Sequence, residues 1–188
     1  MKNLAIFGSG RGSNAKNICD YFSNNSRVNV SCIVTNKKDA YIITHAKKYD
    51  VPVVYTTMQK MNEFDQLKKT LDKYNIDFIV LAGFLLKIPF KIINSYSKKI
   101  INIHPSLLPK YGGKGMYGKN IHRSIIKNKE KESGITIHFV NQNYDEGEII
   151  LQKKCRLFTN ETVSSLEQKI HNLEFRYFPK TIERLILK

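Results

Sequence analysis

The residues best suited to chemistry in this sequence are an amide and an imidazole two positions apart, Asn102 and His104. They stand in the run Ile101-Asn102-Ile103-His104-Pro105-Ser106-Leu107-Leu108-Pro109. Because alternate residues of a β-strand project to the same side, the two polar side chains point together and the isoleucines point into packing. Pro105 cannot donate to a sheet ladder, so the strand ends at His104. Open α/β sheets place their ligands at such carboxyl ends.

A glycine-rich segment near the N-terminus is a candidate anion site: Gly8-Ser9-Gly10-Arg11-Gly12-Ser13-Asn14. Glycines let the backbone approach a phosphate closely, and the helix expected after them offers unpaired N–H groups. The spacing fits neither the dinucleotide fingerprint nor the Walker A loop. We therefore expect a phosphomonoester here. The same residues are also compatible with a plain strand-to-helix turn in which Ser13 caps the helix.

Two further segments allow a structural and a functional interpretation. The polar segment 141–147 contains Asp145 and has the composition of an ordinary hairpin turn. A carboxylate within hydrogen-bond reach of an imidazole would also make that imidazole a better proton donor. The apolar segment 81–89 fits a buried strand-to-helix corner, and it equally fits the wall of a pocket for a flat ring.

The elements that must position these residues follow an alternating pattern. Apolar runs predict strands at 4–7, 28–35, 51–55, 77–82 and 99–104, and periodic segments predict helices at 13–22, 38–48, 62–74 and 89–96. This alternation predicts an α/β fold with a doubly wound, mostly parallel sheet. Residues 135–140 and 149–158 predict an antiparallel pair in the C-terminal half, and 163–186 a long helix with a kink near Pro179.

The amino-acid composition limits the kinds of protein that this sequence can encode. The 188 residues, 41% of them hydrophobic, suffice for one domain with a real core. The net charge of +15 is spread along the chain without a dense basic tail, which favours anionic ligands over a specific nucleic acid. Three distant cysteines predict reduced thiols, and no cluster predicts a metal. No apolar run suggests a membrane span and no signal peptide precedes the first strand, so we expect a cytoplasmic protein.

The Asn-x-His-Pro-Ser-Leu-Leu-Pro run at 102–109 resembles the signature of the folate-dependent formyltransferases, and the resemblance extends from Leu4 to about Leu187. It implies a single formyltransferase domain, 1–188, with a phosphate-binding N-terminal half and a catalytic, folate-binding C-terminal half. It implies 10-formyltetrahydrofolate as co-substrate. In the branch it resembles most, the formyl group passes to the amine of 5-phosphoribosylglycinamide (glycinamide ribonucleotide) in de novo purine synthesis.

The resemblance also implies roles for individual residues. Asn102, His104 and Asp145 are catalytic: the amine attacks directly, Asn102 and His104 assist the oxyanion and the proton transfers, and Asp145 tunes His104. Glu174 lies near the amine or ribose of the nucleotide. His138 matches a family histidine, and we expect it to be structural. The remaining expected contacts are Gly12, Ser13 and Asn14 with the phosphate, and Leu85, Leu86, Lys87, Ile88 and Asn102 with folate.

Other functions remain compatible with the sequence. The lean C-terminus argues against the related methionyl-tRNA formyltransferases, and the absence of an N-terminal module argues against the deformylases, in which water replaces the amine. A nucleic-acid-binding module remains the rival outside the enzymes, and a homodimer is not decided. Leu86 stands where the family often has Arg, and the glycine-rich loop 110–118 is expected to be mobile. His45, His122 and His171 carry no assigned role.

Overall fold

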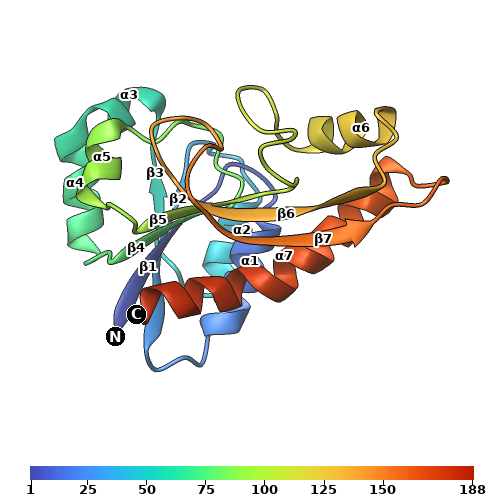
Figure 1. The fold of residues 1–188 in the computed structure, drawn as a ribbon. Coiled ribbons are helices and arrows are strands. Elements are labelled where there is room, and N and C mark those ends of the chain that lie inside the picture. Colours follow the sequence, from blue (N-terminus) through green and yellow to red (C-terminus); the bar gives the residue numbers. More distant parts are fainter.

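The computed structural model describes residues 1–188 and has a seven-stranded mixed sheet at its centre (Figure 1). The strand order is β3-β2-β1-β4-β5-β6-β7. The first five strands are parallel: β1 (Lys2–Phe7), β2 (Val28–Thr35), β3 (Val53–Tyr55), β4 (Phe78–Leu81) and β5 (Ile100–His104). The strands β6 (Glu132–Phe139) and β7 (Ile149–Arg156) are antiparallel. The predicted fold class is confirmed.

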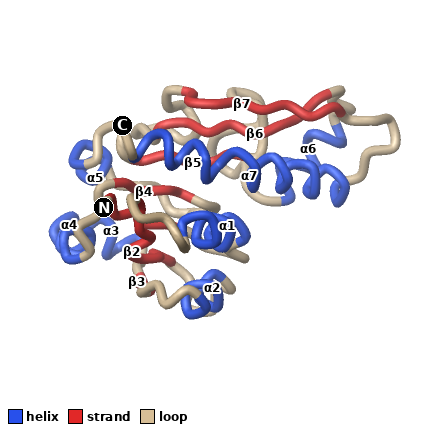
Figure 2. The backbone as a smooth tube through the Cα atoms, turned by 90° about the horizontal axis from the view of Figure 1, so that it is seen from below, coloured by secondary structure: helices blue, strands red, loops and turns tan.

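Two hydrophobic cores cover the two faces of the sheet, and alternate residues of β1 contribute to each of them. Leu4 and Ile6 pack into the core that contains α1 (Ser13–Phe22), α2 (Ile42–Lys48), α6 (Lys119–Lys127) and α7 (Val163–Ile186). Ala5 and Phe7 pack into the core that contains α3 (Met58–Asn62), α4 (Phe64–Lys73) and α5 (Phe90–Ser95). Figure 2 shows α3 and α4 on the side of the parallel strands opposite to α1.

Some element boundaries differ from the sequence prediction. The helix predicted at 62–74 is α4, which begins two residues later at Phe64, and the short helix α3 before it was not predicted. Glu63 leaves the helical conformation between the two helices. The helix predicted from residue 38 begins only at Ile42. The helix α6 was not predicted. Its apolar residues Ile121 and Ile125 do stand at helical spacing, and both are buried in the core beneath the sheet.

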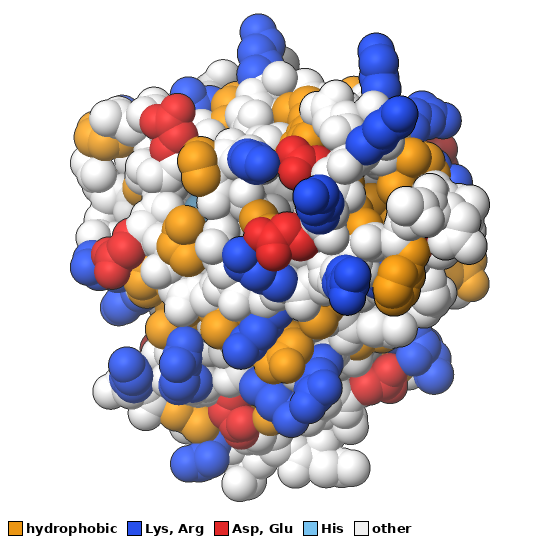
Figure 3. All heavy atoms as spheres, turned by 45° about the vertical axis from the view of Figure 1, so that its right-hand side comes forward, with side chains coloured by type: hydrophobic (Ala, Val, Ile, Leu, Met, Phe, Trp, Pro, Cys, Tyr) orange, Lys and Arg blue, Asp and Glu red, His pale blue; other side chains and the backbone are white.

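Basic side chains are numerous on the surface of the protein. On the face drawn in Figure 3, Lys and Arg side chains are interspersed with acidic and apolar ones. Many lysines pair with nearby carboxylates, as Lys154 does with Glu132 and Lys98 with Glu148. The positive charge of these lysines is therefore partly neutralised by neighbouring carboxylates.

None of the helices combines the length and the apolar composition that a membrane span requires.

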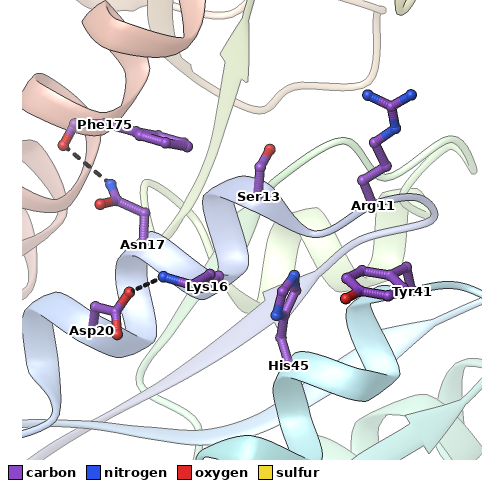
Figure 4. Close-up of a pocket in the computed structure, with 8 residues that line it drawn as sticks. All are labelled: Arg11, Ser13, Lys16, Asn17, Asp20, Tyr41, His45 and Phe175. Atoms are coloured by element: carbon purple, nitrogen blue, oxygen red, sulfur yellow. Dashed lines mark hydrogen bonds and ion pairs between the residues drawn. The ribbon is translucent and has the colours of Figure 1, made fainter.

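The long helix α7 includes Pro179 without interruption and ends at Ile186. Proline has no N–H and leaves the carbonyl four residues earlier without its helical donor. That carbonyl belongs to Phe175, and the Asn17 side chain of α1 donates to it at 3.1 Å (Figure 4). The hydrogen bond from Asn17 thus replaces the one that Pro179 cannot donate, and it also holds α7 against α1.

Candidate active site

One cavity of about 910 Å³ opens at the carboxyl ends of β1, β4 and β5. The loops that follow these three strands form its walls, together with the β6–β7 turn and one face of α7. A cavity of this size suits a small ligand or cofactor. All the site residues expected from the sequence line it, namely Gly12, Ser13, Asn14, Leu85, Leu86, Lys87, Ile88, Asn102, His104, Asp145 and Glu174.

Two polar side chains and one backbone N–H converge on the carboxylate of Asp145. His104 Nδ1 lies 3.4 Å from Asp145 Oδ1, and Asn102 Nδ2 donates to the same oxygen at 3.4 Å. The backbone N–H of Gly113 donates to the other oxygen, Oδ2, at 2.9 Å. His104 is 4% exposed, so this ion pair is shielded from bulk water. The residues that the strand pattern placed on one side of β5 do meet in the structure.

His138 completes this cluster from the neighbouring strand β6, where it pairs in register with Asn102. Its Nδ1 lies 2.8 Å from the carbonyl of Phe139, so Nδ1 carries a hydrogen. Its Nε2 lies 3.2 Å from Asn102 Nδ2 and accepts from that amide. One N–H of Asn102 is thereby fixed on His138 and the other points toward Asp145. The expected structural role of His138 has a specific form here, because the ring orients the Asn102 amide.

The charge of Asp145 follows from these contacts. Burial alone would raise the pKa of this carboxyl, but the contacts with His104 and the Gly113 N–H outweigh burial and hold the pKa far below its ordinary value. Asp145 therefore remains ionised throughout the neutral range. Its backbone has a φ of 59°, a left-handed conformation that directs the side chain back from the turn toward His104.

The glycine loop brings the start of α1 to the cavity. Gly12 has a φ of 74° and precedes the helix, whose first turn receives no hydrogen bond from a capping side chain. A Cβ on Gly12 would lie 2.7 Å from Ile42 Cγ1, so only glycine fits at this point. The alternative in which Ser13 caps the helix is wrong, because Ser13 is its first residue. The free N–H groups of this turn face the cavity and suit an anion.

Glu174 reaches the cavity from α7 and is almost fully buried. Burial raises the pKa of its carboxyl to about 7, although the hydrogen bond from Asn14 Nδ2, at 3.0 Å, and the charge of His104 oppose this. Asn14 Oδ1 is buried and has no hydrogen-bond partner. A buried acceptor without a partner costs free energy unless a ligand supplies a donor. Asn14 and Glu174 thus mark a place for a polar ligand group.

The apolar wall of the cavity is the segment after β4. Gly83 has a φ of 73° and turns the chain away from the strand. Ile88 is buried, whereas Leu85 is 42% exposed at the rim. Ser9 Oγ accepts from the Leu85 backbone N–H at 3.0 Å, so the glycine loop and this wall are joined. The Lys87 ammonium lies over the ring of Tyr144, 5.6 Å from its centre, and connects the wall to the β6–β7 turn.

Sequence reasoning missed several residues of this cavity. His171 stands three residues before Glu174 and Glu167 seven before it, so all three share one face of α7 and line the cavity. Their helical spacing was the available signal. His122 also lines it from α6, and burial lowers the pKa of this histidine.

A second hollow, of about 600 Å³, lies outside the glycine loop between α1, α2 and α7 (Figure 4). Arg11 and Ser13 belong to the walls of both spaces, so the two meet at the glycine loop. His45 lines this outer hollow beside Lys16. Burial, with the charge of Lys16 next, lowers the pKa of His45. His45 is therefore separate from the cluster around Asp145.

Comparison with known proteins agrees with this arrangement. Residues 2–182 match the family model described as formyl transferase, and the chain belongs to that family. It is 37% identical over 187 residues to the chloroplastic phosphoribosylglycinamide formyltransferase of Arabidopsis thaliana, covering 96% of this chain and 64% of that protein. It is 34% identical to the phosphoribosylglycinamide formyltransferase of Haemophilus influenzae, covering 97% of this chain and 86% of that protein.

Solved structures show the same likeness. The crystal structure of glycinamide ribonucleotide transformylase 1 from Geobacillus kaustophilus superposes with a TM-score of 0.88 at 30% identity, and the match covers 99% of each chain. The expected family is therefore confirmed. The chain spans less than two thirds of the plant relative's length and nearly all of the Geobacillus chain.

Proposed function

We propose that this protein transfers the formyl group of 10-formyltetrahydrofolate to the amine of 5-phosphoribosylglycinamide, a step of de novo purine synthesis. One observation carries the proposal. The shielded pair of His104 and Asp145, with Asn102 beside it, faces the same cavity as an uncapped helix start suited to a phosphate. Family membership and the names of the relatives support the same activity.

Formyl transfer to an amine needs a stabilised oxyanion and two proton movements. The substrate amine attacks the formyl carbon, a new C–N bond forms, and the carbonyl oxygen becomes an oxyanion. Asn102 and His104 supply donors to that oxygen. Their present contacts with Asp145 are both 3.4 Å long, so the developing charge can replace them at little cost.

Proton transfer completes the reaction. The nitrogen of the substrate amine, now bonded to the formyl carbon, loses a proton. N10 of the folate gains a proton, and the bond between the formyl carbon and N10 breaks. Asp145 stays ionised and keeps a positive charge on His104 favourable while the proton moves. No covalent intermediate with the protein is needed.

The other contacts orient the two substrates. Gly12, Ser13 and Asn14 bind the phosphate through the start of α1, and Glu174 binds the amine or ribose region next to Asn14. The segment Leu85–Ile88, with Asn102, contacts the folate ring. The Leu86 side chain packs against the core that contains α3, α4 and α5, so it offers no charged group to the folate tail.

Hydrolysis of the formyl folate is the competing reaction, with water in place of the amine. Water has no phosphate, so a deformylase has no use for the helix start at Ser13. The remaining expectations, a cytoplasmic location, the division of the domain into two functional halves and the absence of a specific nucleic-acid partner, stay predictions.

The proposal is tested with 10-formyltetrahydrofolate in the presence and absence of the ribonucleotide. We expect turnover only when the ribonucleotide is present. Asn102→Ala and His104→Ala should each lower kcat by about 10²–10³, the usual effect of removing one oxyanion donor. Asn29→Ala, an exposed asparagine on β2, is the matched control and should retain the wild-type rate. Near-wild-type turnover of both site variants would contradict the proposal.

A further inference from the structure

We propose that Tyr111 is a positioning residue for His104, and that Glu130 and Asn128 at the end of α6 hold it in place. The inference rests on the proposed function and extends it to residues outside the cavity. The backbone carbonyl of Tyr111 lies 2.8 Å from His104 Nε2, on the side of the ring opposite to Asp145. Tyr111, Asn128 and Glu130 do not line the cavity. Their effect on catalysis must therefore pass through His104.

Both nitrogens of His104 face acceptors. Nδ1 faces the ionised carboxylate of Asp145, and Nε2 faces the Tyr111 carbonyl, which can only accept a hydrogen bond. A neutral imidazole has one N–H and could satisfy only one of them. The imidazolium satisfies both. The Tyr111 carbonyl therefore favours the form of His104 that donates protons.

The side chain of Tyr111 fixes that carbonyl. Its hydroxyl donates to Glu130 Oε1 at 2.9 Å and accepts from Asn128 Nδ2 at 2.9 Å, so both of its hydrogen-bonding functions are used. Hydrogen bonds from Tyr111 and Lys110 lower the pKa of Glu130, which keeps this anchor ionised. Tyr111 has a φ of 58°, a conformation that is unfavourable for a tyrosine and needs such support.

The turn between His104 and Tyr111 is also held from within. Ser106 Oγ donates to the Lys110 carbonyl at 2.7 Å. Thr136 of β6 donates to the Ser106 carbonyl at 2.7 Å and accepts from the Leu108 N–H at 3.0 Å. With both ends fixed, a small movement of the Tyr111 side chain is transmitted to its carbonyl.

The same segment serves both members of the ion pair. The carbonyl of Tyr111 contacts His104, and the N–H of Gly113, two residues later, donates to Asp145 Oδ2. The titratable groups around His104 are Asp145, which lies against its Nδ1, and Glu174 from α7, while His138 of β6 contacts the same Asp145 oxygen. A change at the Tyr111 anchor therefore acts on His104 both directly, through the Tyr111 carbonyl, and through Gly113 and Asp145.

The test uses Tyr111→Phe, which deletes only the anchoring hydroxyl, and Glu130→Ala, which deletes its acceptor. Tyr55→Phe on β3 and Glu132→Ala on β6 are matched controls, because both residues are exposed and lie outside the cavity. Two readouts are compared. The first is the ¹⁵N spectrum of the His104 ring in the ligand-free protein as a function of pH, assigned with His104→Gln. The second is the pH profile of kcat for formyl transfer.

In both site variants we expect the ring to lose its imidazolium signals at lower pH than in the wild type, by about half a pH unit. The basic limb of kcat should move equally, with about twofold lower kcat at the pH of the wild-type midpoint, about threefold lower kcat well above it, and unchanged KM for both substrates. The controls should show neither change. An unchanged ring titration in both site variants would overturn the inference, as would a loss of kcat that is the same at every pH. Because the ring spectrum needs no substrate, failure of the proposed function would leave this test intact.

Discussion

Replacement of Glu174 by glutamine tests the electrostatics of the site without any substrate. The folded protein holds the pKa of this carboxyl at about 7, from an ordinary value of 4.5, chiefly through burial. Below pH 4.5 the carboxyl is protonated in both the folded and the unfolded chain. Between pH 4.5 and 7 the unfolded chain releases the proton first, so a rising pH favours unfolding.

The size of this effect follows from the shift itself. A rise from 4.5 to about 7 corresponds to roughly 3 kcal/mol at about 1.4 kcal/mol per pH unit. Local relaxation and water entry reduce this value, so we expect about 1–3 kcal/mol. Glu174→Gln keeps the shape and the acceptor for Asn14 but carries no charge. The free energy of unfolding of the variant should therefore rise by that amount relative to the wild type between pH 5 and pH 8.

Urea unfolding followed by circular dichroism measures this difference, since the chain has no tryptophan. Glu167→Gln on the same helix is the matched control, because the Glu167 carboxyl is more exposed and pairs only loosely with Arg11 and Lys119, at 4.0 and 3.9 Å. The difference in free energy of unfolding between Glu167→Gln and the wild type should change little with pH. A constant difference between Glu174→Gln and the wild type from pH 5 to pH 8 would show that burial does not raise the pKa of Glu174.

Two further substitutions address the catalytic pair and the glycine loop. Asp145→Asn should lower kcat by about 10²–10⁴. Because the folded protein lowers the pKa of Asp145, its stabilising effect is present at neutral pH and is lost progressively as the pH falls below about 4 toward the lowered pKa of the folded state. The difference between wild type and variant in urea unfolding should therefore be constant near pH 7 and shrink steadily below about pH 4. Equal kcat values at neutral pH would contradict its role. Gly12→Ala should destabilise the fold by about 1–3 kcal/mol in thermal unfolding, because its Cβ would collide with Ile42 at a φ of 74°, and should raise KM for the ribonucleotide more than KM for the folate; an unchanged melting temperature would refute this reasoning.

Much of the fold follows from periodicity that local sequence reveals. The helix at Ser13–Phe22 and the strand at Val28–Thr35 have the predicted boundaries, because glycine and polar residues delimit their apolar patterns. The helix α6 was missed because its apolar face consists of only two isoleucines, Ile121 and Ile125, among lysines and asparagines. So short an apolar pattern does not indicate a helix until the packing against the core is known.

The site shows the same limit. The pairing of Asn102 with His104 follows from strand alternation, whereas the approach of Asp145 depends on a left-handed residue in a turn 41 positions further along the chain. No local pattern reveals that approach, and the family resemblance supplied it. The carbonyl of Tyr111 was likewise hidden, because any residue type has a carbonyl and its position depends on the whole turn after β5.

The most direct test of the central claim follows the formyl carbon itself. The protein is incubated with 10-formyltetrahydrofolate labelled with ¹³C in the formyl group, together with 5-phosphoribosylglycinamide, and the products are read by NMR. We expect the label to appear as an amide on the ribonucleotide, at a rate that saturates with the ribonucleotide, and little formate to form when the ribonucleotide is omitted. Label recovered as formate at the same rate in both mixtures would contradict this expectation and assign the cavity to hydrolysis.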